Sequence, residues 1–223
     1  MLKHMLSDLP DQLLTQLFAS STQKHVHAGD LLFAADDPGH GCYRLEKGLL
    51  KVYVTSAHGV ERIIAILGPG AIVGELSMID GHPRSASVVA ISNSALSFIT
   101  RETFVRFTKN HPEIYETLVM ILSARLRETV RSVAATSFLT VKGRVARAVL
   151  DLAKHVAKES SNDRVVLKYN INQADIAAMA GVARENVSRV MSDWKRRRLV
   201  TRSAGFYCIH DLDRIWHEMY FQK

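Results

Sequence analysis

Two short patterns, far apart in the chain, constrain its fold most. The first joins Gly74-Glu75-Leu76-Ser77 to Arg84-Ser85-Ala86 through a loop that contains Asp80-Gly81-His82-Pro83. The second runs from Asn172 to Arg198 and has the residue types of two helices joined by a tight turn. A chain of 223 residues is long enough for two domains that each bury a core. We therefore expect the two patterns to lie in separate domains.

The N-terminal half predicts a β-sandwich or barrel. Short strand-like segments lie between Val26 and Ile99, and glycines separate them. Strands of this length and spacing are typical of these two architectures. The expected strands cover residues 31–33, 43–45, 50–54, 62–67, 71–73 and 87–91. A short helix is expected before them, from Ser7 to Phe18, because apolar residues there recur at helical spacing.

The segment from Val73 to Val88 has the residue types that a cyclic nucleotide requires. Such a ligand carries one delocalised negative charge, a ribose 2′-hydroxyl and a flat base. Gly74 lets the backbone approach closely, the turn after it offers amides, and Glu75 would accept from the ribose hydroxyl. Arg84 would pair with the phosphate, and Ser85 would donate a hydroxyl. The prediction depends on both motifs together, and the alternative is a degenerate cassette that serves folding only.

A long helix is expected from Pro112 to Phe138, because no glycine and no further proline interrupts this stretch. At about 1.5 Å per residue it would span roughly 40 Å. Steps of four and three residues alternate along one stripe, as in a two-stranded coiled coil. This seam consists of Tyr115, Val119, Leu122, Leu126, Thr129 and Val133. A helix packed within its own subunit is the alternative, but this length beside a small β domain favours a homodimer.

The C-terminal part predicts a hinge followed by a helix-turn-helix. Phe138 and Leu139 precede Thr140, a suitable N-cap for a helix over 141–157. A strand is expected over 165–169, and a hairpin over 199–209 that turns at Ser203-Ala204-Gly205. Between them, Asn172 and Asp175 form a capping-box signature for a helix over 173–180. Gly181 supplies the turn, and a second helix follows from near Ala183 to Arg198.

The second helix of this motif has a polar face suited to DNA. Arg184, Glu185, Asn186 and Arg189 lie on its first turns, where side chains reach base edges. Ala177 and Val187 have the apolar spacing of a helix-turn-helix core. Two helices packed only for stability would not require that polar face. For the basic run from Lys195 to Arg198, phosphate contact, support of a wing and a merely solvated face all stay open. The formal net charge of +7 agrees with a polyanionic partner.

The order of elements resembles the Crp/Fnr superfamily of bacterial transcription regulators, and within it the cyclic-AMP receptor branch. The segment from Arg184 to Arg189 is similar to the recognition segment of that branch. Arg125 and Thr129 match positions of the long helix that approach the phosphate and the adenine. The resemblance implies an α+β fold with a cyclic-nucleotide-binding β-barrel of jelly-roll type, a long dimerisation helix and a C-terminal winged helix-turn-helix. The expected boundaries are a sensor domain over 1–111, the dimerisation helix and hinge over 112–139, and the DNA-binding domain over 140–223.

The resemblance also implies a set of site residues. Those expected to contact the nucleotide are Leu67, Val73, Gly74, Glu75, Leu76, Ser77, Arg84, Ser85, Arg125, Thr129 and Val130. Those expected to contact DNA are Lys142, Gln173, Arg184, Glu185, Asn186, Ser188 and Arg189. Three positions depart from the branch: Val130 replaces a serine contributed by the partner subunit, Asn186 replaces a threonine, and Ala183 lacks a polar cap.

These features predict a regulator in which cyclic AMP is the allosteric ligand and cyclic GMP is a second one. The expected partners are a second copy of the chain, double-stranded DNA with TGTGA-like half-sites, and RNA polymerase. The alternative is a regulator of the same type that acts without ligand or senses a cyclic dinucleotide or a haem-bound gas. An enzyme acting on cyclic nucleotides is the rival from another class. It would need a metal cluster or a base near the phosphate, where His82 alone is close in sequence.

Several classes are disfavoured by composition. Two cysteines, Cys42 and Cys208, do not suffice for the four-cysteine iron–sulfur cluster of the superfamily's oxygen sensors or for a disulfide framework. Scattered histidines beside an intact cassette disfavour haem. No apolar run reaches the ~18 residues of a membrane span, and Met1 to Pro10 lacks the features of a signal peptide. We therefore expect a cytoplasmic protein with no catalytic residues, no bound metal and no contact with a membrane.

Overall fold

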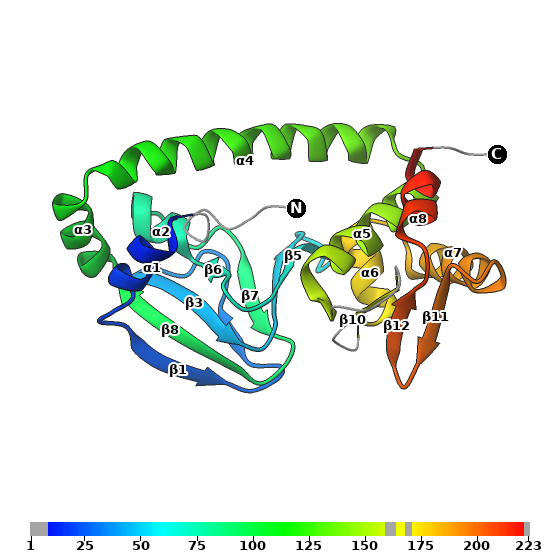
Figure 1. Cartoon of the computed structure of the whole chain (residues 1–223), viewed down its shortest axis with the longest axis horizontal. Helices are drawn as coiled ribbons and strands as arrows, with labels where there is room; N and C mark the ends of the chain where they lie inside the picture. The colour runs from blue at the N-terminus through cyan, green and yellow to red at the C-terminus, as the bar shows by residue number, and fades with distance from the viewer. Residues whose placement is uncertain (1–8, 159–163, 168–170, 221–223) are drawn as a thin grey trace. The chain divides into compact units, whose positions relative to one another are not determined.

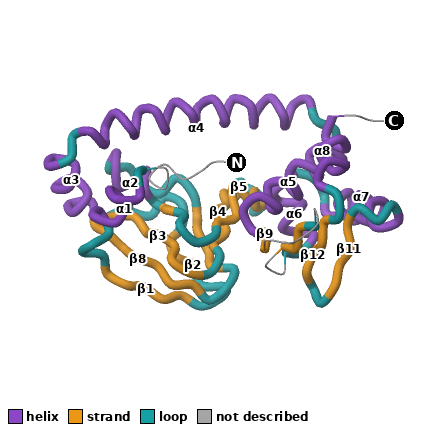
Figure 2. Tube along the Cα trace, in the orientation of Figure 1, coloured by secondary structure: helices purple, strands orange, loops and turns teal. Residues whose placement is uncertain are grey.

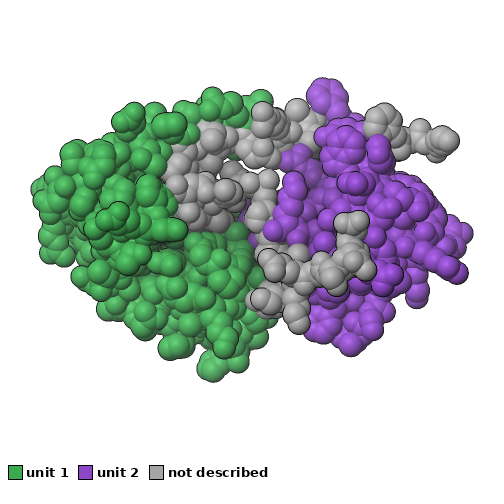
Figure 3. Space-filling model, viewed as in Figure 1, with its two compact units in different colours: residues 1–54, 67–131 green, residues 55–66, 132–223 purple. Residues whose placement is uncertain are grey.

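A computed structural model of the chain describes residues 9–158, 164–167 and 171–220. By its internal contacts the chain divides into two compact units (Figure 3). One unit consists of residues 1–54 and 67–131, and the other of residues 55–66 and 132–223.

The N-terminal strands form a β-sandwich of two four-stranded antiparallel sheets, with orders β1-β8-β3-β6 and β2-β7-β4-β5 (Figures 1 and 2). The strands are β1 (Thr22–Val26), β2 (Leu31–Phe33), β3 (Gly41–Lys47), β4 (Leu50–Thr55), β5 (Glu61–Leu67), β6 (Ile72–Val73), β7 (Ser87–Ala90) and β8 (Ser94–Thr100). The six expected strands correspond to β2 to β7. Strands β1 and β8, which pair with each other over five residue pairs, were not among them.

Helices pack on the outer face of the sheet that contains β3. They are α1 (Asp11–Leu17), α2 (Glu75–Asp80), α3 (Arg101–Asn110) and the start of α4 (Glu113–Phe138). Cys42 of β3 belongs to one buried cluster with Leu17, Met78, Phe104 and Ile114, one residue from each helix. Burial of these apolar side chains is the main force that holds the helices on the sheet. The helix expected over 7–18 begins at Asp11 within the described residues, and α3 was not predicted.

The long helix expected over 112–138 is confirmed as α4, with 26 residues. Its first turns are anchored, since Ile114 and Leu118 are 0% and 5% exposed in the apolar cluster. The apolar members of the expected seam are instead 45% to 67% exposed. They are Tyr115, Val119, Leu122, Leu126 and Val133. One stripe of α4 therefore presents apolar side chains that this chain leaves uncovered.

In the described residues after Thr140, the second unit consists of the helices α5 to α8 and a small sheet of order β11-β12-β10-β9 (Figure 2). Its elements are α5 (Val141–Val156), β9 (Ala157–Lys158), β10 (Val165–Leu167), α6 (Gln173–Ala180), α7 (Arg184–Arg196), β11 (Val200–Ser203), β12 (Phe206–Ile209) and α8 (Leu212–Tyr220). The expected hairpin is confirmed, and its turn residues Ala204 and Gly205 both have positive φ. Helix α5 ends one residue before the expected boundary because Ala157 pairs with Leu167 in the sheet. Helix α8 was not predicted.

The helix caps that the sequence predicted are present. The Thr140 hydroxyl accepts a hydrogen bond from the backbone N–H of Gly143 at 3.2 Å, which fixes the start of α5. Asn172 and Asp175 form the complete capping box at the start of α6. Ala183 caps α7 without a side-chain hydrogen bond, as its missing polar group requires.

Candidate functional site

Arg84 is the centre of the cassette, and it is held on several sides. The residue is 5% exposed, and its Nη1 donates a hydrogen bond to the carbonyl oxygen of Gly74 at 2.7 Å. The guanidinium carbon lies 4.3 Å from the ring centroid of Phe33, at the end of β2. The Arg84 backbone exchanges hydrogen bonds with Asp36 and Asp37 at 2.8 and 2.9 Å. The loop after α2 therefore fixes both the backbone and the side chain of this arginine.

The charge of Arg84 has less compensation than its burial demands. Its Nε is buried and has no hydrogen-bond partner among the described residues. Burial lowers the pKa of Arg84, while Tyr43, Cys42, Glu75 and Asp37 act in the opposite direction. Buried polar groups are normally paired, and buried charges nearly always are. A buried cation with a spare donor is the arrangement that an anionic ligand completes.

Gly74 allows Arg84 to occupy this position. It is the N-cap of α2 and has φ +79, in the left-handed region that favours glycine. A Cβ at position 74 would lie 2.2 Å from the Nη1 of Arg84, so a side chain there would compete with the guanidinium for space. The glycine of the first motif and the arginine of the second thus depend on each other.

The carboxylate of Glu75 belongs to the same electrostatic neighbourhood. Glu75 and Ser77 are 5% and 1% exposed. The pKa of Cys42 is raised well above its ordinary value, chiefly by burial and then by Glu75, whereas Arg84 lowers it. The structure therefore brings an acid, a hydroxyl and a guanidinium together at one buried end of α2.

The other residues expected to contact the nucleotide differ in how far they are exposed. Leu67 and Val73 are buried, Leu76 is 39% exposed, and Ser85 is exposed beside Arg84. Thr129 and Val130 are exposed on α4. The side chain of Arg125 lies outside the described part of the chain.

Sequence reasoning missed the aromatic side chains beside Arg84. Phe33 lies 6.2 Å from Tyr43 between ring centroids, and Tyr43 lies 4.7 Å from Phe98. The Nζ of Lys24 lies 5.3 Å from the Tyr43 ring centroid. These rings come from both sheets, and Phe33 gives the guanidinium of Arg84 an apolar wall. No local pattern marks Phe33, because its partner Arg84 lies on a distant loop.

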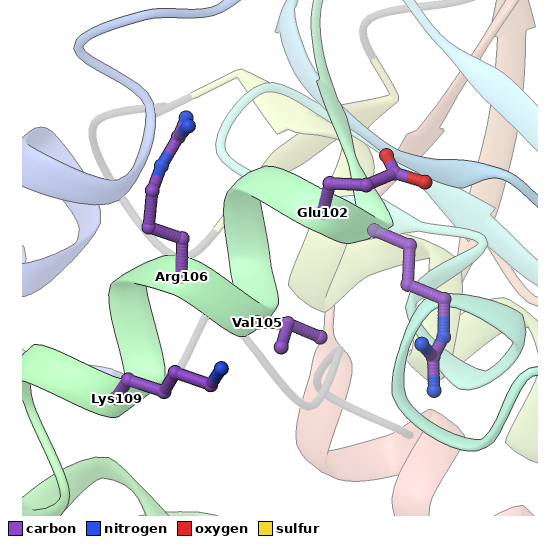
Figure 4. A pocket seen from close by; sticks show the side chains of 5 residues that line it. Glu102, Val105, Arg106 and Lys109 are labelled. Atoms are coloured by element: carbon purple, nitrogen blue, oxygen red, sulfur yellow. The ribbon is translucent and has the colours of Figure 1, made fainter.

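A shallow hollow lies along one face of α3. Arg101, Glu102, Val105, Arg106 and Lys109 line it (Figure 4). All five residues belong to one helix, and the labelled side chains in Figure 4 spread apart instead of converging on a common point. The hollow therefore has the character of a charged helix surface.

The helix-turn-helix has the predicted core and the predicted polar face. Val187 and Ala177 are 0% and 6% exposed, and Gly181 between the helices has φ +62. Several expected DNA contacts are exposed on α7, namely Arg184, Glu185, Ser188 and Arg189. Asn186 and Gln173 are half-buried. The exposed side chains therefore extend from a helix whose other face, with Val187, Met191 and Trp194, is buried.

Lys142 forms ion pairs within the chain, and so do Arg196 and Arg197 of the basic run from Lys195 to Arg198. Lys142 forms ion pairs with Asp193 at 3.7 Å and with Glu218. Arg196 pairs with Asp193 at 3.1 Å, and Arg197 pairs with Glu218 at 2.6 Å. The sequence predicted Lys142 as a DNA contact, and the structure places its ammonium group among carboxylates.

Comparison with known proteins gives the family. Residues 23–111 match the family model described as "Cyclic nucleotide-binding domain", and residues 143–217 match the "Crp-like helix-turn-helix domain". The chain is 33% identical over 177 residues to the cyclic AMP receptor protein of Thermus thermophilus. The aligned region covers 79% of this chain and 78% of the relative. The chain belongs to the Crp/Fnr family. It is a DNA-binding transcription regulator with a cyclic-nucleotide-binding domain, and this family is not one of enzymes.

Two further similarities agree with the Crp/Fnr assignment. The CRP-like cAMP-activated global transcriptional regulator of Mycobacterium tuberculosis is 29% identical over 187 residues, 84% of this chain and 83% of the relative. The solved structure of the c-di-GMP responsive regulator CLP of Xanthomonas campestris has a TM-score of 0.74 at 20% identity. That match covers 90% of this chain and 99% of the other. At that identity the likeness shows the fold alone, an N-terminal β-sandwich with helices and a C-terminal helix-turn-helix with a small sheet.

Two further properties of the described residues concern metal ions and membranes. They contain no group of three or more histidine, cysteine, aspartate or glutamate residues arranged to hold a metal ion. No helix in the described ranges is both long enough and apolar enough to span a bilayer.

Proposed function

We propose that the chain is a cytoplasmic homodimeric regulator that binds cyclic AMP in the cassette, with cyclic GMP as a second ligand. Nucleotide binding shifts the dimer to a form that binds a palindrome with TGTGA-like half-sites. Residues 1–111 act as the sensor, 112–139 as the dimerisation helix and hinge, and 140–223 as the DNA-binding domain. RNA polymerase is the further partner through which the bound dimer acts.

The buried guanidinium of Arg84 is the observation that carries this proposal. It is 5% exposed, and its Nε has no hydrogen-bond partner among the described residues. A cyclic phosphate supplies one negative charge and oxygens that accept from such donors. Its ribose also carries a 2′-hydroxyl, for which the carboxylate of Glu75 is the natural acceptor. An isolated phosphate ion would use Arg84 but would have no use for Glu75.

The signal then passes to the long helix. The phosphate pairs with Arg84 and Ser85, and the base extends to Thr129 on α4. The apolar seam of α4 binds the same seam of a second copy, since exposed apolar stripes of this kind mark protein contacts. The nucleotide activates the dimer only if it binds the DNA-competent arrangement of the hinge at Phe138 to Thr140 more tightly than the idle one. Two curated relatives with cyclic AMP in their names, at 33% and 29% identity, support this ligand.

Calorimetry combined with a gel-shift assay tests the proposal. The purified protein is titrated with cyclic AMP, cyclic GMP and cyclic di-GMP, and each mixture is then added to a labelled TGTGA palindrome. We expect saturable binding of cyclic AMP and a nucleotide-dependent shift. Binding of cyclic di-GMP alone would favour the dinucleotide alternative, and a shift without any ligand would favour a constitutive regulator. Hydrolysis of the nucleotide would contradict the assignment as a regulator.

A further inference from the structure

A cluster of charged side chains joins three helices of the second unit. Lys142 lies in the first turn of α5, Asp193 and Arg197 lie at the end of α7, and Glu218 lies near the end of α8. The carboxylate of Glu218 binds both Lys142 and Arg197, the latter at 2.6 Å. Asp193 lies 3.7 Å from Lys142 and 3.4 Å from Arg197. The two acids thus link Lys142 of α5 to Arg197 at the end of α7 in one network, and Arg196 also pairs with Asp193 at 3.1 Å.

Close backbone packing supports the network. Gly143 follows Lys142, and a Cβ at position 143 would lie 2.8 Å from the carbonyl oxygen of Met219. The first turn of α5 and the last turn of α8 are therefore in contact, which brings Lys142 within reach of Glu218. The side chain of Glu218 is only 11% exposed. Burial is the largest single effect and raises the pKa of Glu218, but the hydrogen bonds and the positive charges of Lys142 and Arg197 together outweigh it, so the pKa lies below its ordinary value.

The network connects the helix that follows the expected hinge to the end of α7. Helix α5 begins directly after the expected hinge, where the Thr140 hydroxyl caps it. Helix α7 carries the exposed Arg184 and Arg189 near its start, and the network holds its other end. The ion pairs therefore add to the packing between α5 and α7, so that a rotation of α5 at the hinge is passed to the end of α7. Partly buried, multiply paired charges suit such a joint better than single exposed pairs, which contribute little.

We propose that Lys142 and Glu218 are positioning residues that lock the recognition helix α7 to the first turn of α5. They transmit movement at the hinge to the side chains that read DNA, and Lys142 does so without contacting a phosphate. This inference requires only that the chain binds DNA through α7, and it holds for any effector. It replaces the expectation that Lys142 contacts DNA directly.

The two roles of Lys142 make opposite predictions for its acidic partner. If Lys142 contacts a phosphate, its loss weakens binding to every sequence and reduces the salt slope by about one. Removal of the negative charge of Glu218 would then leave DNA affinity unchanged or raise it. If the pair positions α7, loss of either charge weakens recognition of the preferred sequence and spares non-specific binding. Loss of both charges costs no more than loss of one.

The experiment compares Lys142→Gln, Glu218→Gln and the double variant with wild type. Dissociation constants are measured over a range of salt concentrations, with a duplex that carries the TGTGA palindrome and with a scrambled duplex of equal length. Lys154→Gln and Asp213→Asn serve as controls, because both residues are exposed charges of the same types, on the helices α5 and α8 that carry Lys142 and Glu218. Urea unfolding is followed by tryptophan fluorescence. The chain's two tryptophans, Trp194 and Trp216, both belong to this unit.

We expect each single variant to weaken binding to the palindrome by roughly 3- to 30-fold, with the double variant no weaker than the worse single one. Affinity for the scrambled duplex and the salt slope stay as in wild type, and the unfolding midpoints are lowered non-additively. Additive losses, or a Glu218→Gln variant that binds as well as wild type or better, would overturn the proposal. If wild type itself does not prefer the palindrome, the operator proposed above is wrong. A duplex selected from random DNA then replaces it in the same comparison.

Discussion

The Nη1 of Arg84 donates a hydrogen bond to the carbonyl oxygen of Gly74, in the space that a side chain at position 74 would occupy. The N–O distance is 2.7 Å, and a Cβ on residue 74 would lie 2.2 Å from the same nitrogen. The two motifs of the cassette are therefore one structural unit, in which the first residue makes room for the cation of the second.

This relationship predicts a specific effect of Gly74→Ala. Alanine at φ +79 is strained by roughly 1 kcal/mol, and its methyl group also displaces the guanidinium. Gly59→Ala is the matched control, because Gly59 has φ +78 but nothing within 4 Å of an added Cβ. We expect both variants to lose stability in urea unfolding, and Gly74→Ala alone to lose nucleotide binding in calorimetry. Equal nucleotide affinity in the two variants would show that Arg84 does not need the space at position 74.

Arg84→Leu should weaken nucleotide binding strongly and leave the fold intact. The variant loses the partner of the phosphate charge, which costs about 1.5–3 kcal/mol, or roughly 10- to 100-fold in affinity. Folding tolerates the change because a leucine at a site that is 5% exposed needs no hydrogen bonds. Calorimetry with cyclic AMP measures the affinity, and thermal unfolding checks the fold. Unchanged affinity in a folded variant would place the nucleotide elsewhere.

Local signals in the sequence were sufficient for much of the fold. The hairpin at Ala204-Gly205, the capping box at Asn172 and the long helix α4 follow from turn chemistry, side-chain capping and uninterrupted helix-forming residues. Each of these signals acts over a few residues, so it survives without knowledge of the tertiary structure. Helices α3 and α8 were missed although Thr100 and Asp211 cap their first turns through hydrogen bonds. Those caps are recognisable in the sequence.

The remainder of the site depends on contacts between distant segments. Phe33 stacks on Arg84 because β2 and the loop after α2 meet in the folded sandwich, and no spacing in the sequence shows this. Lys142 has the residue type and position of a phosphate contact, yet its carboxylate partners come from α7 and α8. Family resemblance assigns a role by position, and it cannot reveal an ion pair that is formed by other helices.

The exposed seam of α4 predicts that Leu122 and Leu126 hold a dimer together. Replacing both by aspartate puts charges where apolar side chains would meet, so we expect monomers in sedimentation and loss of DNA binding. Replacing both by methionine keeps the apolar volume and should preserve the dimer. If the aspartate variant still sediments as a dimer, the interface lies on another surface.

Arg189 and Lys195 should differ in the kind of DNA binding they support. Both are exposed on α7, Arg189 on the turns expected to face the bases and Lys195 at the far end. Arg189→Ala should cost roughly 1–3 kcal/mol at one base pair of each half-site and relax the preference there. Lys195→Ala should weaken all sequences alike if it contacts a phosphate. Competition between operator variants measures the preference. Selection of an unrelated half-site from random DNA would refute the assigned operator.

Thr129 should distinguish the two purine ligands. Its hydroxyl, exposed on α4, is an acceptor for the exocyclic amine of adenine, which guanine lacks at that position. Val130 offers no second hydroxyl there, so the preference depends on one hydrogen bond of about 1 kcal/mol, or roughly five- to tenfold. Thr129→Ala should therefore weaken cyclic AMP by about that factor and leave cyclic GMP nearly unchanged. Thr129→Ser keeps the hydroxyl and should retain the preference.

Because Thr129 lies on the seam, sedimentation must first show that each variant is still a dimer. Paired titrations of both ligands then decide the matter, since equal losses for the two nucleotides would mean that Thr129 does not read the base.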